Sequence, residues 1–520
     1  MGIFSLLLGA GMASCVGDLN TEPIDKSIIT SENAYKNPEA YQEVLAKIYS
    51  IFALSGQQGP SGKPDLATSD EGTSNYLRQL WNLQELTTDE AICAWSNAGL
   101  PDLHNQSWSA ANDYVTITYE RIYYLISVVN EYLRQTTDQK LDSRGVSGNL
   151  RTEIGYYRAE ARLMRALAYY QALDLYANVP FVDENDGVGS YNPRQIDRKE
   201  LFNWLQTELI ALDPLLKEPG TNEYARADQA TAWTILAKMY LNAEIYTGTP
   251  MYTEAITYSN KIIPHYDLED NYQHLFMADN HTAREIIFPI AFDGLRTQTY
   301  GGTTFLIFAS LGGDSIVTQN YGASGGWAGN RTSDQFMEKF EPGDHRAIFF
   351  TKGQTSTAIN QVSDFKQGVI VTKFSNMKST GGAGSSYDFA DTDFPMFRLA
   401  DIYLIYAEAV LRGGSGGSLS TALGYVNDLR ERAFGNASGD ISSSELTLDF
   451  ILEERARELY WEGHRRTDLI RFGKFSQTTY TWPWKGGIKE GRSVNATYNL
   501  FPLPTSDLGA NPNLKQNPGY

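Results

Sequence analysis

Apolar residues recur every three to four positions along several segments of this chain, with alanine at the close-packing positions. In residues 157–177 the stripe is formed by Leu163, Leu167, Tyr170 and Leu173, and the pattern stops just before Pro180. Because 3.6 residues make one turn of an α-helix, this spacing predicts an amphipathic helix that ends before the proline. A chain with several such segments buries its apolar stripes by packing one helix against another.

The pattern returns at 228–244, 398–411 and 419–433, and a glycine-rich turn separates the last two segments. Two helices joined in this way form a helical hairpin. Such pairs resemble tetratricopeptide-like units, although the sequence has no strict repeat of about 34 residues. We therefore predict a mainly α fold, a tetratricopeptide-like scaffold of helical hairpins. Further helices are predicted at 116–134, 199–216, 252–263 and 448–461.

The character of the sequence changes between residues 285 and 391, where glycine-rich, β-prone and loop-like stretches interrupt the predicted helices. Here we predict irregular loops with short β-strands. Irregular insertions on a rigid base commonly carry function, so ligand-binding insertions are expected around 60–115 and 285–395. Since no linker-like tract or composition break divides the chain, residues 15–520 are predicted to form a single domain.

The charge balance excludes some ligands and the aromatic content suggests others. Forty-three basic residues against 62 acidic ones give a net charge of −19, without a basic stripe, which argues against nucleic acid and anionic polymers. Aromatic residues make up 12% of the chain, and many Tyr and Trp lie in polar, glycine-rich surroundings. Such rings can stack on the C–H face of a sugar. The alternative is that they fill a core.

Cys15 closes an apolar run that begins at Ile3. The run is shorter than the ~20 residues of a spanning helix, so residues 1–14 are predicted to be a secretory signal. Small residues before Cys15 favour lipoprotein processing, with a lipid on its thiol as the membrane anchor. No Lys or Arg precedes the run, so we expect the translation start upstream. The alternative is an ordinary buried cysteine, as we predict for Cys93.

Five strings together resemble the SusD/RagB family of surface glycan-binding lipoproteins. Their order and span, from residue 15 to residue 520, make the resemblance specific. It implies a helical tetratricopeptide-like scaffold with an irregular ligand-binding face, held at the outer leaflet of the outer membrane. It also implies a role as the cap of a SusC-like TonB-dependent transporter that receives oligosaccharides from it. The strings are CVGDLNTEPID, YRAEARLMRALAYYQALDLYANVPFV, FRLADIYLIYAEAVLRGG, ILEERARELYWEGHRRTDLIRFGKF and FPLPTSDLGANPNLKQNPGY.

Within the family, the motifs resemble the α-glucan-binding branch, where two Trp and one Tyr form an arc that follows a helical glucan. By position and context, Trp95, Tyr300 and Trp327 resemble that arc, and Arg78 and Asn97 resemble its hydrogen-bonding partners. Residues 76–99, which contain Arg78, Trp95 and Asn97, have weak helical periodicity and a mix of polar and aromatic residues that suggests exposure. Glycines around Tyr300 and Trp327 let the chain bend so that a ring faces a ligand. The resemblance therefore implies a cell-surface lipoprotein that captures polysaccharide or oligosaccharide, with starch-like α-glucan favoured.

Other residues are interpreted structurally. Trp81 is predicted to lie in the core because Leu80 and Leu83 surround it. The alternating charges at 453–458 are expected to form exposed ion pairs on a helix. The turn-forming asparagines, prolines and glycine of 511–519 predict a tail in successive tight turns. A second charged group is expected to lock the last helices and this tail together, namely Glu462, Arg465, Arg466, Asp468 and Arg471.

Two other classes of function are considered as alternatives. A cell-surface glycoside hydrolase needs two carboxylates across a cleft, and Asp89 and Glu90 are poor candidates because adjacent residues rarely face each other. No nucleophile elbow, phosphate loop or zinc-ligand pair is present, and the acidic stretch 183–187 lacks the spacing of a calcium loop and is interpreted as a turn. We predict no enzymatic activity, no cofactor and no bound calcium or other metal. A helical-repeat scaffold that binds only protein should have its aromatics buried.

Overall fold

The computed structural model describes residues 31–187, 189 and 192–520. Cys15 and the predicted signal segment 1–14 lie outside these residues. The helices are α1 Ser31–Ala34, α2 Ala40–Ala53, α3 Tyr76–Glu85, α4 Pro101–Asn105, α5 Asp113–Gln135, α6 Asp138–Ser143, α7 Gly148–Leu175, α8 Arg198–Leu212, α9 Gln229–Leu241, α10 Ala243–Thr247, α11 Tyr252–Ile262, α12 Gly302–Ser310, α13 Asp334–Met337, α14 Leu399–Leu411, α15 Leu419–Phe434, α16 Leu448–Leu459, α17 Arg465–Arg471 and α18 Thr505–Ala510. The strands are β1 Ile92–Cys93, β2 Val179–Pro180, β3 Gln195–Ile196, β4 Ile286–Ile290, β5 Asn330–Arg331, β6 Phe349–Phe350, β7 Ile370–Val371 and β8 Phe394–Arg398.

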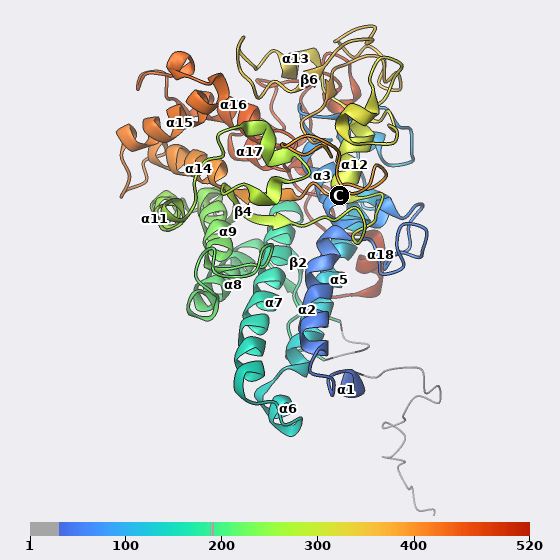
Figure 1. Cartoon of the computed structure of the whole chain (residues 1–520), viewed down its shortest axis with the longest axis vertical. Coiled ribbons are helices and arrows are strands. Elements are labelled where there is room, and N and C mark those ends of the chain that lie inside the picture. The colour runs from blue at the N-terminus through green and yellow to red at the C-terminus, as the bar shows by residue number, and fades with distance from the viewer. Residues whose placement is uncertain (1–30, 188, 190–191) are drawn as a thin grey trace, which may run out of the picture.

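A continuous series of paired helices forms the scaffold. Helix α5 packs on α7, α7 on α8, α8 on α9, α9 on α11, α11 on α14 and α14 on α15. In Figure 1 this series runs from the centre of the molecule to its left side. The predicted hairpin of α14 and α15 is confirmed, since the rings of Tyr403 and Tyr425 stack at 4.2 Å between the two helices. Each apolar stripe thus faces a neighbouring helix, as the sequence pattern predicts.

The insertion at residues 286–398 leaves and rejoins the scaffold at one two-stranded sheet. Strands β4 and β8 are antiparallel, with Ile286 opposite Arg398 and Ile290 opposite Phe394. Glu285, just before β4, also forms a 2.8 Å ion pair with the Arg398 guanidinium at the end of β8. The entry and exit of the insertion are therefore held together at this junction.

Two helices of the candidate region were not anticipated. Residues 302–310, expected to be loop or β-prone, form α12, and residues 76–85, expected to be exposed with weak helical character, form α3. Every residue of both helices is buried. Helix α12 has no charged or amide side chain, so its sequence lacks the polar face on which a helix prediction depends, whereas α3 carries polar side chains such as Arg78, Gln79 and Glu85 that the fold buries. Surrounding contacts decide the structure of both helices instead.

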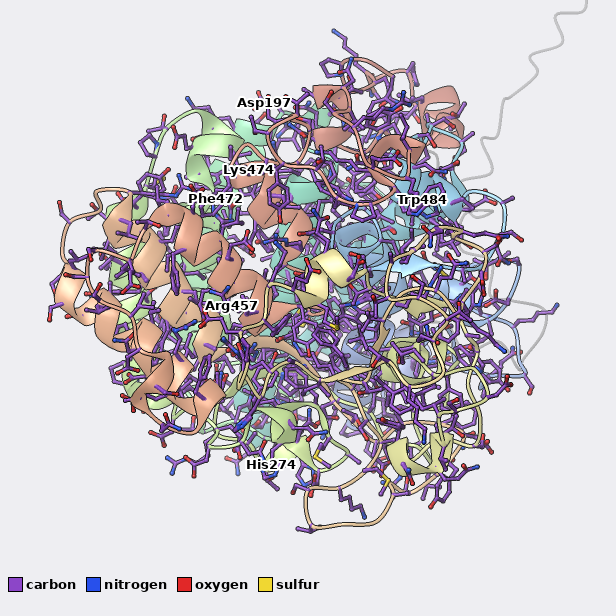
Figure 2. The ribbon with its side chains drawn as sticks, turned by 90° about the horizontal axis from the view of Figure 1, so that it is seen from above. Asp197, His274, Arg457, Phe472, Lys474 and Trp484 are labelled. Atoms are coloured by element: carbon purple, nitrogen blue, oxygen red, sulfur yellow. The ribbon has the colours of Figure 1, made fainter. Side chains whose placement is uncertain are left out.

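The expectation of exposed ion pairs at 453–458 is wrong. Figure 2 labels Arg457 on α16, whose buried face also carries Glu454 and Glu458. Glu454 lies 2.7 Å from Arg457 and 2.7 Å from Arg346, and Glu458 lies 2.6 Å from Arg398. The charged residues that recur on one face of α16 therefore pair with buried arginines of other elements, Arg346 and Arg398. A buried charge is tolerated when it is paired and hydrogen-bonded.

The C-terminal tail lies over the scaffold as predicted. Arg466 donates to the carbonyl of Asn499 at 2.9 Å, and Asn517 Nδ2 donates to the carbonyls of Tyr176 and Phe501 at 2.7 and 2.9 Å. Asn511 donates to the Pro193 carbonyl at 2.9 Å. Because both asparagines are buried and donate to backbone carbonyls, the tail is part of the folded core.

Several smaller interpretations are confirmed. Trp81 and Cys93 are buried, and Trp81 Nε1 donates to the Trp461 carbonyl at 3.1 Å. The acidic stretch from Asp183 forms a turn in which the Asn185 amide donates to the Asp183 carboxylate at 2.8 Å. Across the ranges that the structure describes, no helix combines the length and the apolar character needed to cross a membrane.

Candidate functional site

A short sheet brings the two candidate tryptophans together. Strands β1 and β5 pair antiparallel, with Cys93 opposite Asn330. Trp95 follows β1 and Trp327 precedes β5, so the pairing sets them side by side although they are far apart in sequence. Trp95 Nε1 donates to the Trp327 carbonyl at 3.0 Å. Both rings are partly buried, which leaves part of each accessible to a ligand.

Helix α12 is the support on which the aromatic rings rest. Its nine residues span about 13 Å. The Trp95 ring lies 6.2 Å from Phe305 in the middle of this helix, and the Trp327 ring lies 5.1 Å from Phe308 one turn later. The Trp327 amide also donates to the Phe308 carbonyl at 2.7 Å. The rings are thus fixed by a buried helix rather than by a free loop.

Tyr300 lies just before α12 and completes the cluster. Its ring is 6.2 Å from that of Trp327 in an edge-on arrangement, and 42% of the residue is exposed. Its amide donates to the Glu71 carboxylate at 2.8 Å. Asn75 joins the two helices beside Tyr300, since its Oδ1 accepts from the amides of Arg78 and Gly302 at the starts of α3 and α12. We call Trp95, Tyr300 and Trp327 the aromatic cluster.

Arg78 lies beneath the aromatic cluster. Its guanidinium stands 4.5 Å over the Phe305 ring and 5.9 Å from the Trp95 ring, and only 8% of the residue is exposed. Nη1 is 3.5 Å from the Tyr300 carbonyl and 3.5 Å from Asp70. Within the described part of the chain, Nε finds no hydrogen-bond partner. The expectation that this segment is exposed is therefore wrong, although Arg78 does lie at the predicted site.

Asn97 is the candidate that the structure leaves apart. It is exposed two residues after Trp95, and its carbonyl accepts from the Leu100 amide at 3.0 Å. Among the described residues, no contact joins its side chain to the other four candidates. Its part in binding stays a prediction.

Sequence reasoning missed Asp70 and Tyr387. The Asp70 carboxylate is half-exposed and accepts from the Thr73 amide at 2.8 Å beside Arg78. Tyr387 is 48% exposed, and its carbonyl accepts from the Ser324 amide at 2.7 Å in the loop that leads to Trp327. The turn-capping pattern from Asp70 to Thr73 is a signal that could have identified the first. We find no comparable signal for Tyr387, because its proximity depends on tertiary contacts.

Gly329 allows the Trp95 ring to lie against the chain. A Cβ added there would stand 2.5 Å from Trp95 Cε2, so the ring would have to move. We expect Gly329→Ala to weaken the sugar binding predicted from the sequence by up to about tenfold, the contribution of one stacked ring. Gly325→Ala is the control, because a Cβ there meets nothing within 4 Å. Calorimetry with maltoheptaose measures both, and equal affinities in the two variants would contradict the role assigned to Gly329.

Comparison with known proteins decides the family. Residues 343–520 match the SusD family. The starch-binding protein SusD of Bacteroides thetaiotaomicron is 34% identical to this chain, over 99% of the chain and 97% of its own length. The chain belongs to the SusD family. A SusD-like protein of Bacteroides ovatus is 26% identical over 85% of this chain and 77% of its own length. The family resemblance carried by the five strings is confirmed.

Solved structures share the fold of this SusD-family protein. Surface glycan-binding protein A from Bacteroides thetaiotaomicron, in complex with laminarihexaose, has a TM-score of 0.69 at 21% identity and covers 92% of this chain and 99% of its own. A SusD homologue from the same organism has a TM-score of 0.73 at 18% identity, covering 94% and 98%. At these identities the likeness concerns the fold, and it confirms the mainly α, tetratricopeptide-like architecture.

The carboxylates nearest Trp95 in the sequence of this SusD-family protein point into its core. Asp89 is buried 2.7 Å from Arg465, and despite the opposing effect of burial, the charge and hydrogen bonds of Arg465 hold its pKa well below the usual range. Glu90 is also buried and accepts from the Trp461 amide at 2.8 Å. In the described ranges, no group of three or more His, Cys, Asp or Glu side chains is arranged to hold a metal ion.

Glu85 and Glu90 form a buried carboxyl pair that should make stability depend on pH. Burial raises the pKa of Glu85 to about 7, and burial together with the Glu85 charge raises that of Glu90 well above its ordinary value. The folded chain therefore retains protons that the unfolded chain releases above about pH 4.5. By linkage, the stability that this pair contributes is present at low pH and falls as the pH rises toward 7 and beyond.

Glu85→Gln tests this pair, because glutamine keeps the shape and neutrality of the protonated acid. We expect the free energy of unfolding of the variant, measured in urea at pH 5 and pH 8, to fall less with pH than that of the wild type. The carboxylates paired with arginine stay ionised across this interval, so they cancel in the comparison. An identical pH dependence in the two proteins would show that Glu85 does not carry the shifted titration.

Proposed function

We propose that this SusD-family protein binds neutral glycan at the cell surface, with starch-like α-glucan as its ligand. The observation that carries the proposal is the aromatic cluster, three partly exposed rings supported by α12, with Arg78 beneath them and Asp70 beside Arg78. Ring faces stack on the apolar faces of sugars, while a guanidinium and a carboxylate bind hydroxyl groups. The relative that is 34% identical over nearly the whole chain is named a starch-binding protein, which supports the choice of ligand.

The protein-binding scaffold is the weaker alternative, because it predicts buried aromatics and the cluster is partly exposed. The hydrolase alternative is weaker as well. A glycosidase pairs an acid with a base or nucleophile across a cleft, whereas Asp89 is held in the core by Arg465 and Glu90 by the Trp461 amide. We therefore infer a binding protein without hydrolytic activity. Sustained release of sugars from a polysaccharide panel by the purified chain would overturn this.

The ligand assignment is tested with a panel of oligosaccharides. Calorimetry and thermal denaturation are measured with maltoheptaose and with laminarihexaose, the ligand named for one structural neighbour. Maltoheptaose is expected to bind and to raise the unfolding temperature, since a ligand of the folded state stabilises it. Binding of laminarihexaose alone would replace the α-glucan assignment while keeping the site, and binding of neither would remove both.

Anchoring and delivery extend the same proposal. We infer that a lipid on Cys15 holds the protein on the outer membrane and that it passes oligosaccharide to a SusC-like TonB-dependent transporter. The support is family membership together with the cysteine that follows residues 1–14. Cell fractionation of Cys15→Ala tests the anchor, because the variant should leave the membrane fraction. Co-purification of the wild type with a large outer-membrane barrel tests the partner.

A further inference from the structure

A second groove is lined in part by the loop that carries Asp70. It has a volume of about 540 Å³, within the range of small-molecule sites, and it is lined by α5, the end of β2 and α18. These elements are labelled together below α3 and α12 in Figure 1. Leu66 belongs to its wall, and Asp70 of the same loop lies at the aromatic cluster. Four residues of chain span at most about 14 Å, so the two sites are close.

The groove has an aromatic floor built by one helix. Tyr119, Tyr123 and Tyr124 line it from α5, and the first two rings lie 4.6 Å apart at 43°. Tyr123 and Tyr124 are partly exposed, whereas Tyr119 is nearly covered. Residues one turn apart on a helix face the same side, which explains why one stretch of α5 provides this surface.

Hydrogen bonds hold the walls of the groove in place. The Tyr123 hydroxyl donates to the Pro180 carbonyl at 2.6 Å, and the Tyr119 hydroxyl bonds to the Asp507 carboxylate of α18. The Thr505 amide donates to the Ala110 carbonyl at 3.0 Å, which ties α18 to the segment before α5. The groove is therefore formed before any ligand arrives, which lowers the ordering cost of binding.

The polar groups of the groove select the class of ligand. The described residues along its walls provide the carboxylates of Glu120 and Asp507 and the hydroxyls of Ser127 and Ser506, and none of them is a cation. Glu120 and Asp507 interact, and burial and the Asp507 charge raise the pKa of Glu120. Carboxylates that are partly desolvated gain from hydroxyl donors, while tyrosine rings gain from C–H faces. An anionic ligand is disfavoured.

We infer that this groove is a second binding site for neutral oligosaccharide, placed so that a long glucan held by the aromatic cluster continues into it. The inference rests on the proposed function for the identity of the sugar. Its consequence is a preference for long chains, because the second contact becomes intramolecular once the first has formed. A ligand too short to reach both sites gains nothing from the second.

Ser127→Trp tests the groove without touching the core. Ser127 is exposed on α5 and its hydroxyl donates to the carbonyl three residues before it, at 2.8 Å. Ser143→Trp is a matched control, since Ser143 is exposed on α6 and makes the same bond at 2.8 Å. We expect Ser127→Trp to lose about a hundredfold in affinity for long-chain amylose, the low end of the gain from linked sites, and to bind maltotriose unchanged.

Binding in the groove is distinguished from binding at the aromatic cluster by removing the rings of the cluster. In a Trp95→Ala/Trp327→Ala background, we expect weak residual binding of maltoheptaose by saturation-transfer NMR, lost on adding Ser127→Trp and kept with Ser143→Trp. Three results would each overturn the inference. The first is loss of all binding in that background, and the second is residual binding that Ser127→Trp leaves intact. The third is a groove that binds oligolysine instead of the sugar. If the Trp95→Ala/Trp327→Ala background binds as the wild type does, the proposed function fails.

Discussion

Trp95→Ala is expected to lower the affinity for maltoheptaose by about tenfold or more. A stacked ring contributes about 0.5–1.5 kcal/mol beyond the area it buries, and 1.4 kcal/mol is a factor of ten. The substitution also removes the bond from Trp95 Nε1 to the Trp327 carbonyl, so the loop that carries the second ring loses a tie. Isothermal titration calorimetry measures the change.

Trp484→Ala is a closely matched control for this experiment. Trp484 is also partly buried, and its Nε1 donates to the Ile359 carbonyl at 2.9 Å, a bond of the same kind as that of Trp95. Figure 2 labels Trp484 away from the C-terminal helices that carry Arg457. We expect its loss to reduce stability without changing affinity. Equal affinities for the Trp95 and Trp484 variants would remove Trp95 from the site.

Arg398→Ala is expected to destabilise the protein by about 3–5 kcal/mol, the cost of leaving buried charges without their partner. The guanidinium lies 2.8 Å from Glu285, 2.6 Å from Glu458 and 2.7 Å from Glu462, and all four residues are buried. Because Arg398 and Glu285 close the insertion that carries Tyr300 and Trp327, unfolding should begin there. Urea denaturation followed by tryptophan fluorescence measures the loss.

Arg151→Ala provides the comparison for a surface ion pair. Arg151 lies 2.8 Å from Asp138 and 3.0 Å from Asp142, and both carboxylates are largely exposed. Such pairs contribute about 0–1 kcal/mol, so this variant should remain close to the wild type. Arg398→Lys keeps the charge but not the forked geometry, and it should fall between the two. Similar losses in the free energy of unfolding for Arg398→Ala and Arg151→Ala would show that the buried ion pairs of Arg398 do not hold the insertion in place.

Prediction from sequence succeeded where a residue's neighbours lie close along the chain. The stripe in α7 and the hairpin of α14 and α15 follow from local spacing, and both are present. It failed for α12, which lacks a polar face, and for α3, whose polar side chains are buried by distant parts of the chain. It failed too for Glu454 and Glu458, because their partners Arg346 and Arg398 lie far away in sequence.

The same division holds for the candidate site. Glycines beside Tyr300 and Trp327 were a local signal, and the structure brings both rings together with Trp95. The burial of Arg78 was not foreseeable, since it depends on α12 lying over α3. Asp70 offered a local capping signal with Thr73, but its proximity to Arg78 depends on how the loop folds. Whether these side chains bind sugar remains a prediction.

A crystal structure of the protein with maltoheptaose tests the central claim most directly. The account predicts a curved glucan whose apolar faces lie on Trp95, Tyr300 and Trp327, with sugar hydroxyls within hydrogen-bond reach of Arg78 or Asp70. Density for the oligosaccharide elsewhere on the molecule, with all three rings left in solvent, would contradict it.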